Sequence, residues 1–403
     1  MKMTIMPGKA RGFVQAPPSK SMAHRLLMGA GLSEGQSRIR YIELSEDIKA
    51  TLGILEALGA TYTVEEDTVI MRGVGKNILH TTQPLDCNES GSTLRFFVPL
   101  VCNGQGPYRF IGAKRLMERP LSVYESLCKE QGIRFEKSEN GLWVEGTLKP
   151  GHFQVRGDIS SQFITGLLYA LPMLAGESVL EVLPPVESKA YIEMTLYALD
   201  CFGIHVRRDG YTFYIDGNQT YHAKDVEVEG DYSNAAFLEA LQLIGGEVQV
   251  KGLQAESLQG DAIYQTYFKQ LKESAPILDI SECPDLGPIL MGMAAVSHGA
   301  RFTGTRRLKM KESDRGVVMS QELAKFGIQV DVFENEIVVH PGTLQTPTEI
   351  LDSHNDHRIA MTMAVLCTLI GGTITCAEAV KKSFPTFCEV LESLGIETRR
   401  ECE

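Results

Sequence analysis

Glycine residues recur along this chain at a nearly constant interval, and this interval constrains the fold more than any other feature of the sequence. Six apolar, helix-like runs each end in a glycine that leads into a short β-rich segment. These glycines are Gly35, Gly106, Gly176, Gly246, Gly299 and Gly372, with separations of 71, 70, 70, 53 and 73 residues. Single helices often end in glycine, but they do not keep a fixed interval, so we interpret the chain as six copies of one repeat.

Each repeat predicts the same order of elements, namely helix, strand, helix, strand and strand. The second helix ends in another glycine, which precedes a hairpin that turns over charged and polar residues. These second glycines are Gly59, Gly132, Gly203, Gly327 and Gly395. In the fourth repeat the second helix reaches Ser274 without a glycine and the hairpin is missing, which explains the shorter interval of 53 residues.

Six such repeats predict an α/β (α+β) fold with two domains of three repeats each. The length of 403 residues suits two domains, at about 100–200 residues per domain. We expect the break between the domains after the third hairpin, near residues 222–230.

The charge and cysteine content exclude several classes of protein. With 39 basic and 51 acidic residues the net charge is -12, which argues against a nucleic-acid partner or an anionic membrane surface. The nine cysteines are scattered without a CxxC motif, so neither a disulfide framework nor a zinc cage is indicated. No apolar stretch reaches the roughly 20 residues that span a bilayer, and the N-terminus has no signal-peptide pattern. We therefore expect a cytoplasmic protein without a membrane segment.

The expected starts of the first helices carry an unusual set of side chains. Ser, Asp and Asn residues cap helices in any protein, but an arginine one turn inside a helix N-terminus is unfavourable unless an anion is bound there. The cations that accompany these starts are Lys20, Arg25, Arg95 and Arg358. The sequence thus predicts sites for phosphate or carboxylate groups at equivalent helix ends.

Further cations precede the second helices of three repeats, at Arg119, at residues 309–315 and at Lys381 with Lys382. In an acidic protein this concentration predicts a small substrate with more than one anionic group, held between the two domains. Carboxylates that stand among these cations are candidates for proton transfer. They are Asp285, Glu312 and Asp356.

A metal site is the main alternative for one of these segments. Asp352, His354, Asp356 and His357 are residue types that bind zinc or manganese. No other His-rich segment completes such a site, and the neighbouring Arg358 would repel a cation. We expect no metal ion.

Six motifs occur in one order along the chain: PPSKSMAHR, ESGSTLRFF, GDISSQFITGLL, KMKESDR, DSHNDHRIAM and KKSFPTF. From Met1 to Glu403 this order closely resembles the 5-enolpyruvylshikimate-3-phosphate synthase family of enolpyruvyl transferases. The resemblance implies a two-domain inside-out α/β barrel with six β-α-β-α-β-β units. It also implies one domain of residues 1–15 and 228–403, a second of residues 16–227, and an active site in the interdomain cleft.

The activity that the resemblance implies is transfer of the enolpyruvyl group of phosphoenolpyruvate to the 5-hydroxyl of shikimate 3-phosphate. Phosphate is released through a tetrahedral intermediate, and the family uses no metal and no organic cofactor. By motif match, Asp285 resembles the base and Glu312 the acid, with Lys20 sharing the proton transfer. We expect a monomer whose partners are these two small molecules, with no nucleic acid and no membrane.

The resemblance also implies two sets of binding residues. For shikimate 3-phosphate they are Lys20, Ser21, Arg25, Ser160, Ser161, Gln162, Ser188, Tyr191, Asp285 and Lys311. For phosphoenolpyruvate they are Lys20, Gly91, Arg119, Gln162, Arg315, His357, Arg358 and Lys382. Gly91 has a physical reason to be glycine, because a residue without Cβ lets an anion approach the backbone N–H groups closely.

Two positions depart from the family pattern, and two alternative functions stay open. Glu89 stands where the family often has asparagine, and Arg307 stands where an asparagine is sometimes found. One alternative is transfer to UDP-N-acetylglucosamine by the sister enzyme of the same fold, although its loop cysteine has no counterpart here. The other is a catalytically silent protein of this fold that binds a phosphorylated metabolite.

Overall fold

The computed structural model describes residues 1–104 and 106–401, and it divides the chain into two compact domains. The terminal domain comprises Met1–Ser19 and Glu229–Glu403, and the middle domain comprises Lys20–Val228. The chain therefore passes between them after Ser19 and after Val228, where the resemblance implied passages after residues 15 and 227.

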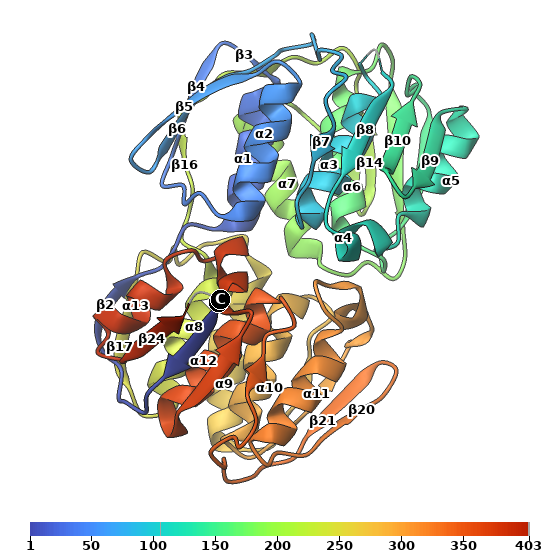
Figure 1. Cartoon of the computed structure of the whole chain (residues 1–403). Coiled ribbons are helices and arrows are strands. Elements are labelled where there is room, and N and C mark those ends of the chain that lie inside the picture. Colours follow the sequence, from blue (N-terminus) through green and yellow to red (C-terminus); the bar gives the residue numbers. More distant parts are fainter. Residues whose placement is uncertain (105, 402–403) are drawn as a thin grey trace. The chain divides into compact units, whose positions relative to one another are not determined.

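Both domains mix helices with short strands (Figure 1). The helices of the middle domain are α1 (Lys20–Leu32), α2 (Glu46–Ala57), α3 (Gly91–Val101), α4 (Lys114–Glu118), α5 (Ser122–Gln131), α6 (Ser161–Ala170) and α7 (Lys189–Cys201). Its strands are β3 (Ser33–Glu34), β4 (Gln36–Arg40), β5 (Thr61–Glu65), β6 (Thr68–Arg72), β7 (Leu85–Asp86), β8 (Tyr108–Ile111), β9 (Arg134–Ser138), β10 (Gly141–Glu145), β11 (His152–Arg156), β12 (Ser178–Leu183), β13 (Arg207–Asp209), β14 (Thr212–Ile215), β15 (Tyr221–His222) and β16 (Val226–Glu227).

The terminal domain has the same kinds of element. Its helices are α8 (Tyr232–Leu243), α9 (Tyr264–Glu273), α10 (Gly287–Ala295), α11 (Arg315–Lys325), α12 (His357–Ile370) and α13 (Phe387–Ser393). Its strands are β1 (Lys2–Ile5), β2 (Arg11–Gln15), β17 (Glu247–Lys251), β18 (Ile277–Asp279), β19 (Ala300–Thr303), β20 (Val330–Val332), β21 (Glu336–Val339), β22 (Leu351–Asp352), β23 (Gly372–Thr375) and β24 (Thr398–Glu401). Short 3₁₀ turns lie at η1 (Leu171–Met173), η2 (Gly260–Ile263), η3 (Pro284–Leu286), η4 (Arg306–Met310) and η5 (Ala377–Lys382).

Five four-stranded sheets share one strand pattern. In each, a parallel pair is followed by two antiparallel strands, as in β11-β12-β14-β13. The other four orders are β16-β4-β6-β5, β7-β8-β10-β9, β18-β19-β21-β20 and β22-β23-β1-β24. The predicted absence of a hairpin from the fourth repeat is confirmed, because α9 ends at Glu273, β18 begins at Ile277, and β17 pairs with β2 alone in a two-stranded sheet.

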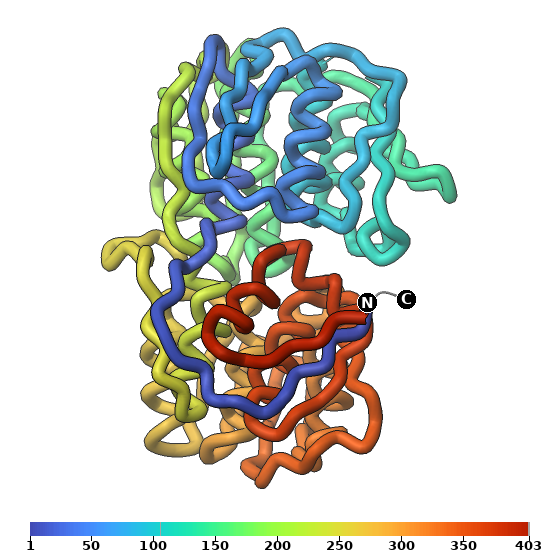
Figure 2. The backbone as a smooth tube through the Cα atoms, turned by 60° about the vertical axis from the view of Figure 1, so that its left-hand side comes forward, coloured from blue at the N-terminus to red at the C-terminus, as the bar shows by residue number. Residues whose placement is uncertain are grey.

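The N-terminal strand closes the last sheet of the terminal domain. Met3 of β1 pairs antiparallel with Ile374 of β23 on one side and with Arg400 of β24 on the other. Figure 2 shows this first segment of the chain running beside the last one. The sheet therefore takes its third strand from the opposite end of the sequence.

The first helix of each repeat forms the core of its domain. In the middle domain α3 is buried at every position except Ser92, and α1 is buried from Met22 to Leu32. In the terminal domain α10 is buried throughout. A helix that is apolar all round must be covered on all sides; here the neighbouring first helices do this together with the sheets and the second helices, as where α3 packs against α6 and α10 against α12 (Figure 1).

The second helices end as expected, whereas four first helices do not end at the predicted glycine: α3 already ends at Val101 and α6 at Ala170, and Gly106 and Gly176 lack left-handed backbone. The five second glycines all have left-handed backbone, with φ between 69° and 108°. At the ends of α8 and α12, however, the left-handed residues are Gly245 and Gly371 rather than Gly246 and Gly372. Each of these pairs is Gly-Gly, so the sequence did not distinguish the two positions.

None of the helices among the described residues is both long and apolar enough to cross a membrane.

Close helix packing makes a prediction at Gly166 of α6. A Cβ atom there would lie 2.4 Å from the carbonyl oxygen of Arg95 on α3 and 2.5 Å from the Tyr124 hydroxyl. We expect Gly166→Ala to lower the free energy of unfolding by roughly 1–3 kcal/mol, because the two helices must move apart. Urea denaturation of the middle domain measures this change.

The matched control is Gly53, an exposed glycine within α2 of the same domain, where a Cβ would meet nothing within 4 Å. Gly53→Ala should raise the free energy of unfolding by up to about 1 kcal/mol, the usual helix-propensity gain. Equal effects at the two positions would show that the contact of α6 with α3 is not tight.

Candidate functional site

The predicted site residues fall into two clusters, one in each domain. The middle domain holds Lys20, Ser21, Arg25, Gly91, Arg119, Ser160, Ser161, Gln162, Ser188 and Tyr191. The terminal domain holds Asp285, Lys311, Glu312, Arg315, His357, Arg358 and Lys382. Each cluster lies at the starts of first helices and at the segments that lead into second helices, as the repeat predicted.

Helix capping accounts for part of the polar sequence at these starts. The side chains of four residues accept hydrogen bonds from backbone N–H groups of the first turn: Ser90, Ser160, Asp231 and Asp356. Ser160, for example, accepts from the N–H of Gln162 at 3.3 Å. Capping leaves the cations at the same helix ends unexplained.

Two arginines converge on Gly91 at the start of α3. A Cβ atom on Gly91 would lie 2.8 Å from Nη1 of Arg119 and 3.0 Å from Nη1 of Arg95. Arg95 also donates to Oε1 of Gln162 at 2.6 Å, and Gln162 donates to the Ser92 hydroxyl at 2.9 Å. Two buried guanidinium groups beside one glycine and a helix N-terminus make a site of positive potential that favours a carboxylate or phosphate.

Arg25 joins the helices α1 and α7 of the middle domain. It donates to Thr195 Oγ1 at 2.9 Å, to the carbonyl of Ser21 at 2.7 Å, and to the carbonyl of Tyr191 at 3.1 Å. Burial lowers the pKa of Arg25 to about 10, so the group stays charged at neutral pH. In this conformation its N–H groups serve the contacts of α1 with α7, which the sequence did not indicate.

The remaining members of this cluster lie at the starts of α1, α6 and α7. Lys20 forms an ion pair of 2.7 Å with Asp47 of α2. Ser161 is buried as the first residue of α6. Ser188 is buried before α7 with left-handed backbone at φ 55°, and the Tyr191 ring lies 5.7 Å from the Arg25 guanidinium.

Arg315 is the centre of the cluster in the terminal domain. Its side chain is 1% exposed and contacts Asp356 at 2.9 Å, Asp285 at 2.7 Å and Glu312 at 2.8 Å. Asp356 is completely buried and also accepts from the Ser313 hydroxyl at 3.0 Å. A buried guanidinium shared by three carboxylates fixes their positions through charge-assisted bonds.

Asp285 lies among three cations. Lys311 is 3.0 Å and Arg315 is 2.7 Å from its Oδ1, and Arg358 is 3.9 Å from its Oδ2. Burial alone would raise the pKa of Asp285, but the attraction of Lys311, Arg358 and Arg315 outweighs it and holds the pKa well below the ordinary value. The carboxylate is therefore stable as an anion in this state.

Three further predicted residues surround this network. Arg358 is buried at the start of α12, donates to the carbonyl of Ser233 at 3.2 Å, and lies over the Phe237 ring. His357 is buried beside it, 4.0 Å from Asp356. Lys382, at the end of η5, donates to the carbonyl of Asn355.

Two buried acids that contact or face predicted site residues, Asp261 and Asp47, were not predicted from the sequence. Asp261 is buried in η2, within electrostatic reach of Asp285 and Arg358. Burial, followed by repulsion from Asp285, raises its pKa to about 6. Asp47 was missed because it reads as an ordinary acid in the first turn of a helix, and no local signal marks its ion pair with Lys20.

The two departures from the family pattern have different surroundings. Arg307 is buried in η4 and donates to the carbonyl of Ser281 at 3.3 Å, so the buried guanidinium has a hydrogen-bond acceptor in the same domain. Glu89 is half-buried, directly before the cap residue Ser90. Within the described part of the chain, no three His, Cys, Asp or Glu side chains gather where they could hold a metal ion.

The raised pKa of Asp261 predicts a pH-dependent stability. The folded protein holds this proton up to about pH 6, while the unfolded chain releases it near the ordinary value of 3.8. The folded state thus binds more protons between these values, and the free energy of unfolding falls as pH rises. From about pH 4.5 to about pH 7.5 the wild type should lose about 2 kcal/mol relative to Asp261→Asn.

Urea denaturation at both pH values measures this difference. Glu256→Gln, an exposed acid in the same domain, serves as the control and should follow the wild type. If the free energies of unfolding of the wild type and Asp261→Asn differed by the same amount at both pH values, the raised pKa of Asp261 would be contradicted.

The chain is similar to known proteins along nearly its whole length. A family model described as EPSP synthase (3-phosphoshikimate 1-carboxyvinyltransferase) matches residues 6–391. A 3-phosphoshikimate 1-carboxyvinyltransferase of Clostridium perfringens (strain 13 / Type A) is 40% identical over 425 aligned residues, covering 99% of this chain and 100% of that protein. Another, from Clostridium botulinum (strain Alaska E43 / Type E3), is 39% identical over 419 residues, covering 97% and 96%.

Solved structures agree on the fold. An EPSP synthase from Acinetobacter baumannii superposes with a TM-score of 0.78 at 22% identity, over 99% of this chain and 100% of that one. This likeness shows a mixed α/β fold of two domains. With a family model that spans nearly the whole sequence and full-length relatives near 40% identity, the chain belongs to the EPSP synthase (3-phosphoshikimate 1-carboxyvinyltransferase) family.

Proposed function

We propose that the two clusters carry out one reaction, the transfer of the enolpyruvyl group of phosphoenolpyruvate to the 5-hydroxyl of shikimate 3-phosphate, with release of phosphate. The activity follows from membership of the family and from relatives that bear its name over their full length. Among the structural observations, the one that supports it most directly is Arg315, buried among Asp285, Glu312 and Asp356. A reaction between two anions requires cations such as Arg315, and proton transfer in both directions requires carboxylates such as Asp285 and Glu312.

The finer architecture is part of the proposal. The five sheets with one strand order support six β-α-β-α-β-β units, three in each domain, arranged as an inside-out α/β barrel. In this arrangement the fourth unit has lost its hairpin, and the first helices point their N-terminal ends to one side of each domain. The active site of the proposal lies in the cleft between the domains.

Shikimate 3-phosphate is proposed to bind mainly to the middle domain. Hydroxyl groups and cations at the starts of α1, α6 and α7 suit a phosphate and several sugar-like hydroxyls. The proposed ligands are Lys20, Ser21, Arg25, Ser160, Ser161, Gln162, Ser188 and Tyr191, with Asp285 and Lys311 from the terminal domain. Arg25 must exchange some of its present bonds to take part, since it now donates to Thr195, Ser21 and Tyr191.

Phosphoenolpyruvate is proposed to bind to cations of both domains. The guanidinium groups of Arg119 and Arg95 at Gly91 match a phosphate or carboxylate. Gln162 accepts a hydrogen bond from Arg95. The proposed ligands are Lys20, Gly91, Arg119, Gln162, Arg315, His357, Arg358 and Lys382. Because neither domain holds the full set, both are needed for the reaction.

Binding of the anions should convert Asp285 into a better base. In the present state Lys311, Arg358 and Arg315 hold its pKa well below the ordinary value, which makes it a weak proton acceptor. A phosphate or carboxylate that draws these cations to itself weakens their pull on Asp285. The proton affinity of the carboxylate then rises at the moment when the 5-hydroxyl has to be deprotonated.

The proposed proton transfers balance over the two steps. In the addition, Asp285 takes the proton of the attacking 5-hydroxyl while Glu312 protonates the methylene carbon of phosphoenolpyruvate, giving the tetrahedral intermediate. In the elimination, Glu312 takes a proton from the methyl group, Asp285 returns its proton to the departing phosphate, and the enol double bond forms again. Lys20 is proposed to share this proton traffic, and Asp47 keeps its ammonium group in place at 2.7 Å.

The proposal includes no metal ion and no organic cofactor, and it takes the protein as a cytoplasmic monomer. Transfer to UDP-N-acetylglucosamine and a silent binding role find no support in the family model or in the relatives described above. The experiment that tests the function is phosphate release by purified protein given phosphoenolpyruvate in EDTA.

Release should depend on shikimate 3-phosphate and should not occur with UDP-N-acetylglucosamine as acceptor. Insensitivity to EDTA is expected because the transfer uses only side chains. Release with UDP-N-acetylglucosamine alone would contradict the acceptor, and no release with either would favour a silent binding protein.

The base assignment predicts the effect of Asp285→Asn. Turnover should fall by about 100-fold or more, since general base catalysis contributes on that scale, while KM for both substrates changes far less. Steady-state kinetics with each substrate varied in turn measures both quantities. If affinity fell as much as turnover, Asp285 would be a binding group and not the base.

A further inference from the structure

The fourth repeat differs from the other five because one strand lacks a partner. The strands equivalent to β17 are β4, β8, β12, β19 and β23, and each pairs with one parallel and one antiparallel neighbour. Among the described residues β17 pairs only with β2. The missing neighbour is the last strand of the absent hairpin.

The hydrogen-bonding groups at this edge can be assigned from the pairing of β17 with β2. Glu247 donates to the carbonyl of Ala10, and Lys251 accepts from the N–H of Ala16, so both face β2. Because backbone groups alternate along a strand, those of Val248 and Val250 point to the open side. An open row of this kind is a template for another strand.

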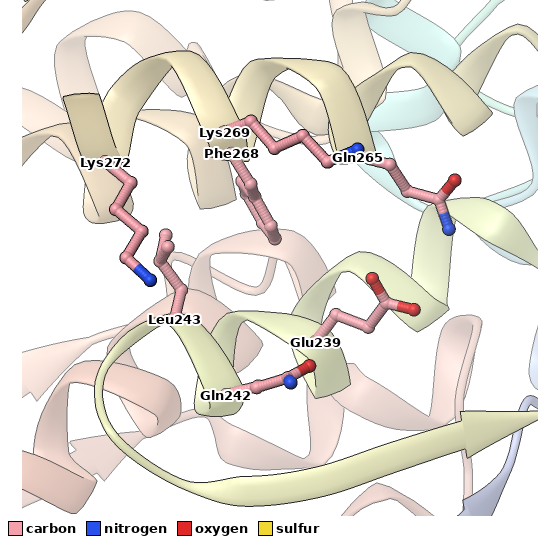
Figure 3. A pocket seen from close by; sticks show the side chains of 7 residues that line it. All are labelled: Glu239, Gln242, Leu243, Gln265, Phe268, Lys269 and Lys272. Atoms are coloured by element: carbon pink, nitrogen blue, oxygen red, sulfur yellow. The ribbon is translucent and has the colours of Figure 1, made fainter. Parts of the chain in front are cut away.

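A pocket lies at the helices that the missing hairpin would cover. In the fifth repeat β21 packs against α10 and β20 against α11. The equivalent helices of the fourth repeat, α8 and α9, instead line a pocket of about 400 Å³ (Figure 3). Phe268 and Leu243 form its apolar part, and Figure 3 shows side chains of both helices around it.

The charge of the pocket favours an acidic occupant. Lys269 and Lys272 of α9 line it, are exposed, and form no ion pair within the described part of the chain. The one carboxyl group in the lining is Glu239, whose pKa is raised by burial, and the two lysines outnumber it. In a protein of net charge -12 this is a local excess of positive charge.

We propose that the open edge of β17 and the pocket between α8 and α9 bind an extended segment of a partner protein. The segment adds to β17 as an antiparallel strand, places apolar side chains at alternating positions over Phe268 and Leu243, and presents acidic residues to Lys269 and Lys272. A second copy of this chain fits less well. Its own β17 edge and pocket carry the same two lysines, Lys269 and Lys272, and no excess of acidic residues that would complement them.

The chain itself contains a probe of the required chemistry. Residues 328–340 form the hairpin that covers the equivalent place in the fifth repeat. The hairpin carries apolar residues at alternating positions, Val330 with Val332 and Ile337 with Val339, and it is acidic through Asp331, Glu334 and Glu336. A synthetic peptide of this sequence should therefore bind to the open edge of the whole protein.

Fluorescence anisotropy of the labelled peptide, with a scrambled peptide beside it, measures the binding. Lys269→Glu combined with Lys272→Glu should weaken it by about tenfold, from the loss and reversal of two charge contacts. Lys129→Glu is the matched control, because this exposed lysine lies on α5, the equivalent second helix that β9 covers. All three proteins should keep their transferase activity.

Hydrogen exchange gives a readout at the edge itself. The peptide should slow exchange of the Val248 and Val250 amides, while those of Glu247 and Gln249, already paired with β2, change little. The proposal is overturned if the peptide binds no better than its scrambled form, or if the double lysine variant binds it as the wild type does. It is also overturned if sedimentation shows a dimer that the lysine variant abolishes, because the occupant would then be a second copy.

Discussion

A helix that is apolar on every side can be stable only when other elements cover it completely, and this constraint organises the whole molecule. The first helices of the repeats, such as α3 and α10, are buried along nearly their full length. Their sides are mainly apolar, with few polar groups such as His24, and most of the predicted site residues lie at or near the helix ends. The N-terminal ends combine free N–H groups with positive potential, and there the chain concentrates its serines, lysines and arginines.

The same constraint explains how so many charged groups can be buried. Arg315 is 1% exposed yet contacts three carboxylates, and Arg25 is buried with hydroxyl and carbonyl partners. A buried charge without partners would cost several kcal/mol, so each of these groups is held by others. Such a network is also suited to exchange, because an anionic substrate can replace a carboxylate or carbonyl as the partner of a cation. The interactions that stabilise the free protein are therefore the ones that the proposed substrate binding would rearrange.

The fourth repeat shows what the hairpins contribute. Where a hairpin is present, as with β20 and β21, it pairs with the central strand and covers the two helices of its repeat. Where it is absent, β17 keeps an open edge, and α8 exposes Gln242 near its end although it is buried for most of its length. The domain stays folded because the parallel pair of β17 with β2 still covers α8.

The sequence by itself determined the features that depend on near neighbours along the chain. The glycine interval, the order of elements, the missing hairpin and the cations at helix starts all follow from residue type and spacing, because helix ends and turns are specified locally. The identity of the family was also visible in six ordered motifs. Helix ends within Gly-Gly pairs were off by one residue, since either glycine can adopt the left-handed conformation.

Only the tertiary structure decided which of these groups meet. The contacts of Arg315 with Asp285 and Asp356, the ion pair of Lys20 with Asp47, and the burial of Asp261 join residues from separate elements. Their geometry depends on how helices pack, and packing is set by the whole core and not by local propensity. The pairing of β1 with β23 and β24 is of the same kind, because a strand finds its partners through the sheet that buries it and not through its place in the sequence.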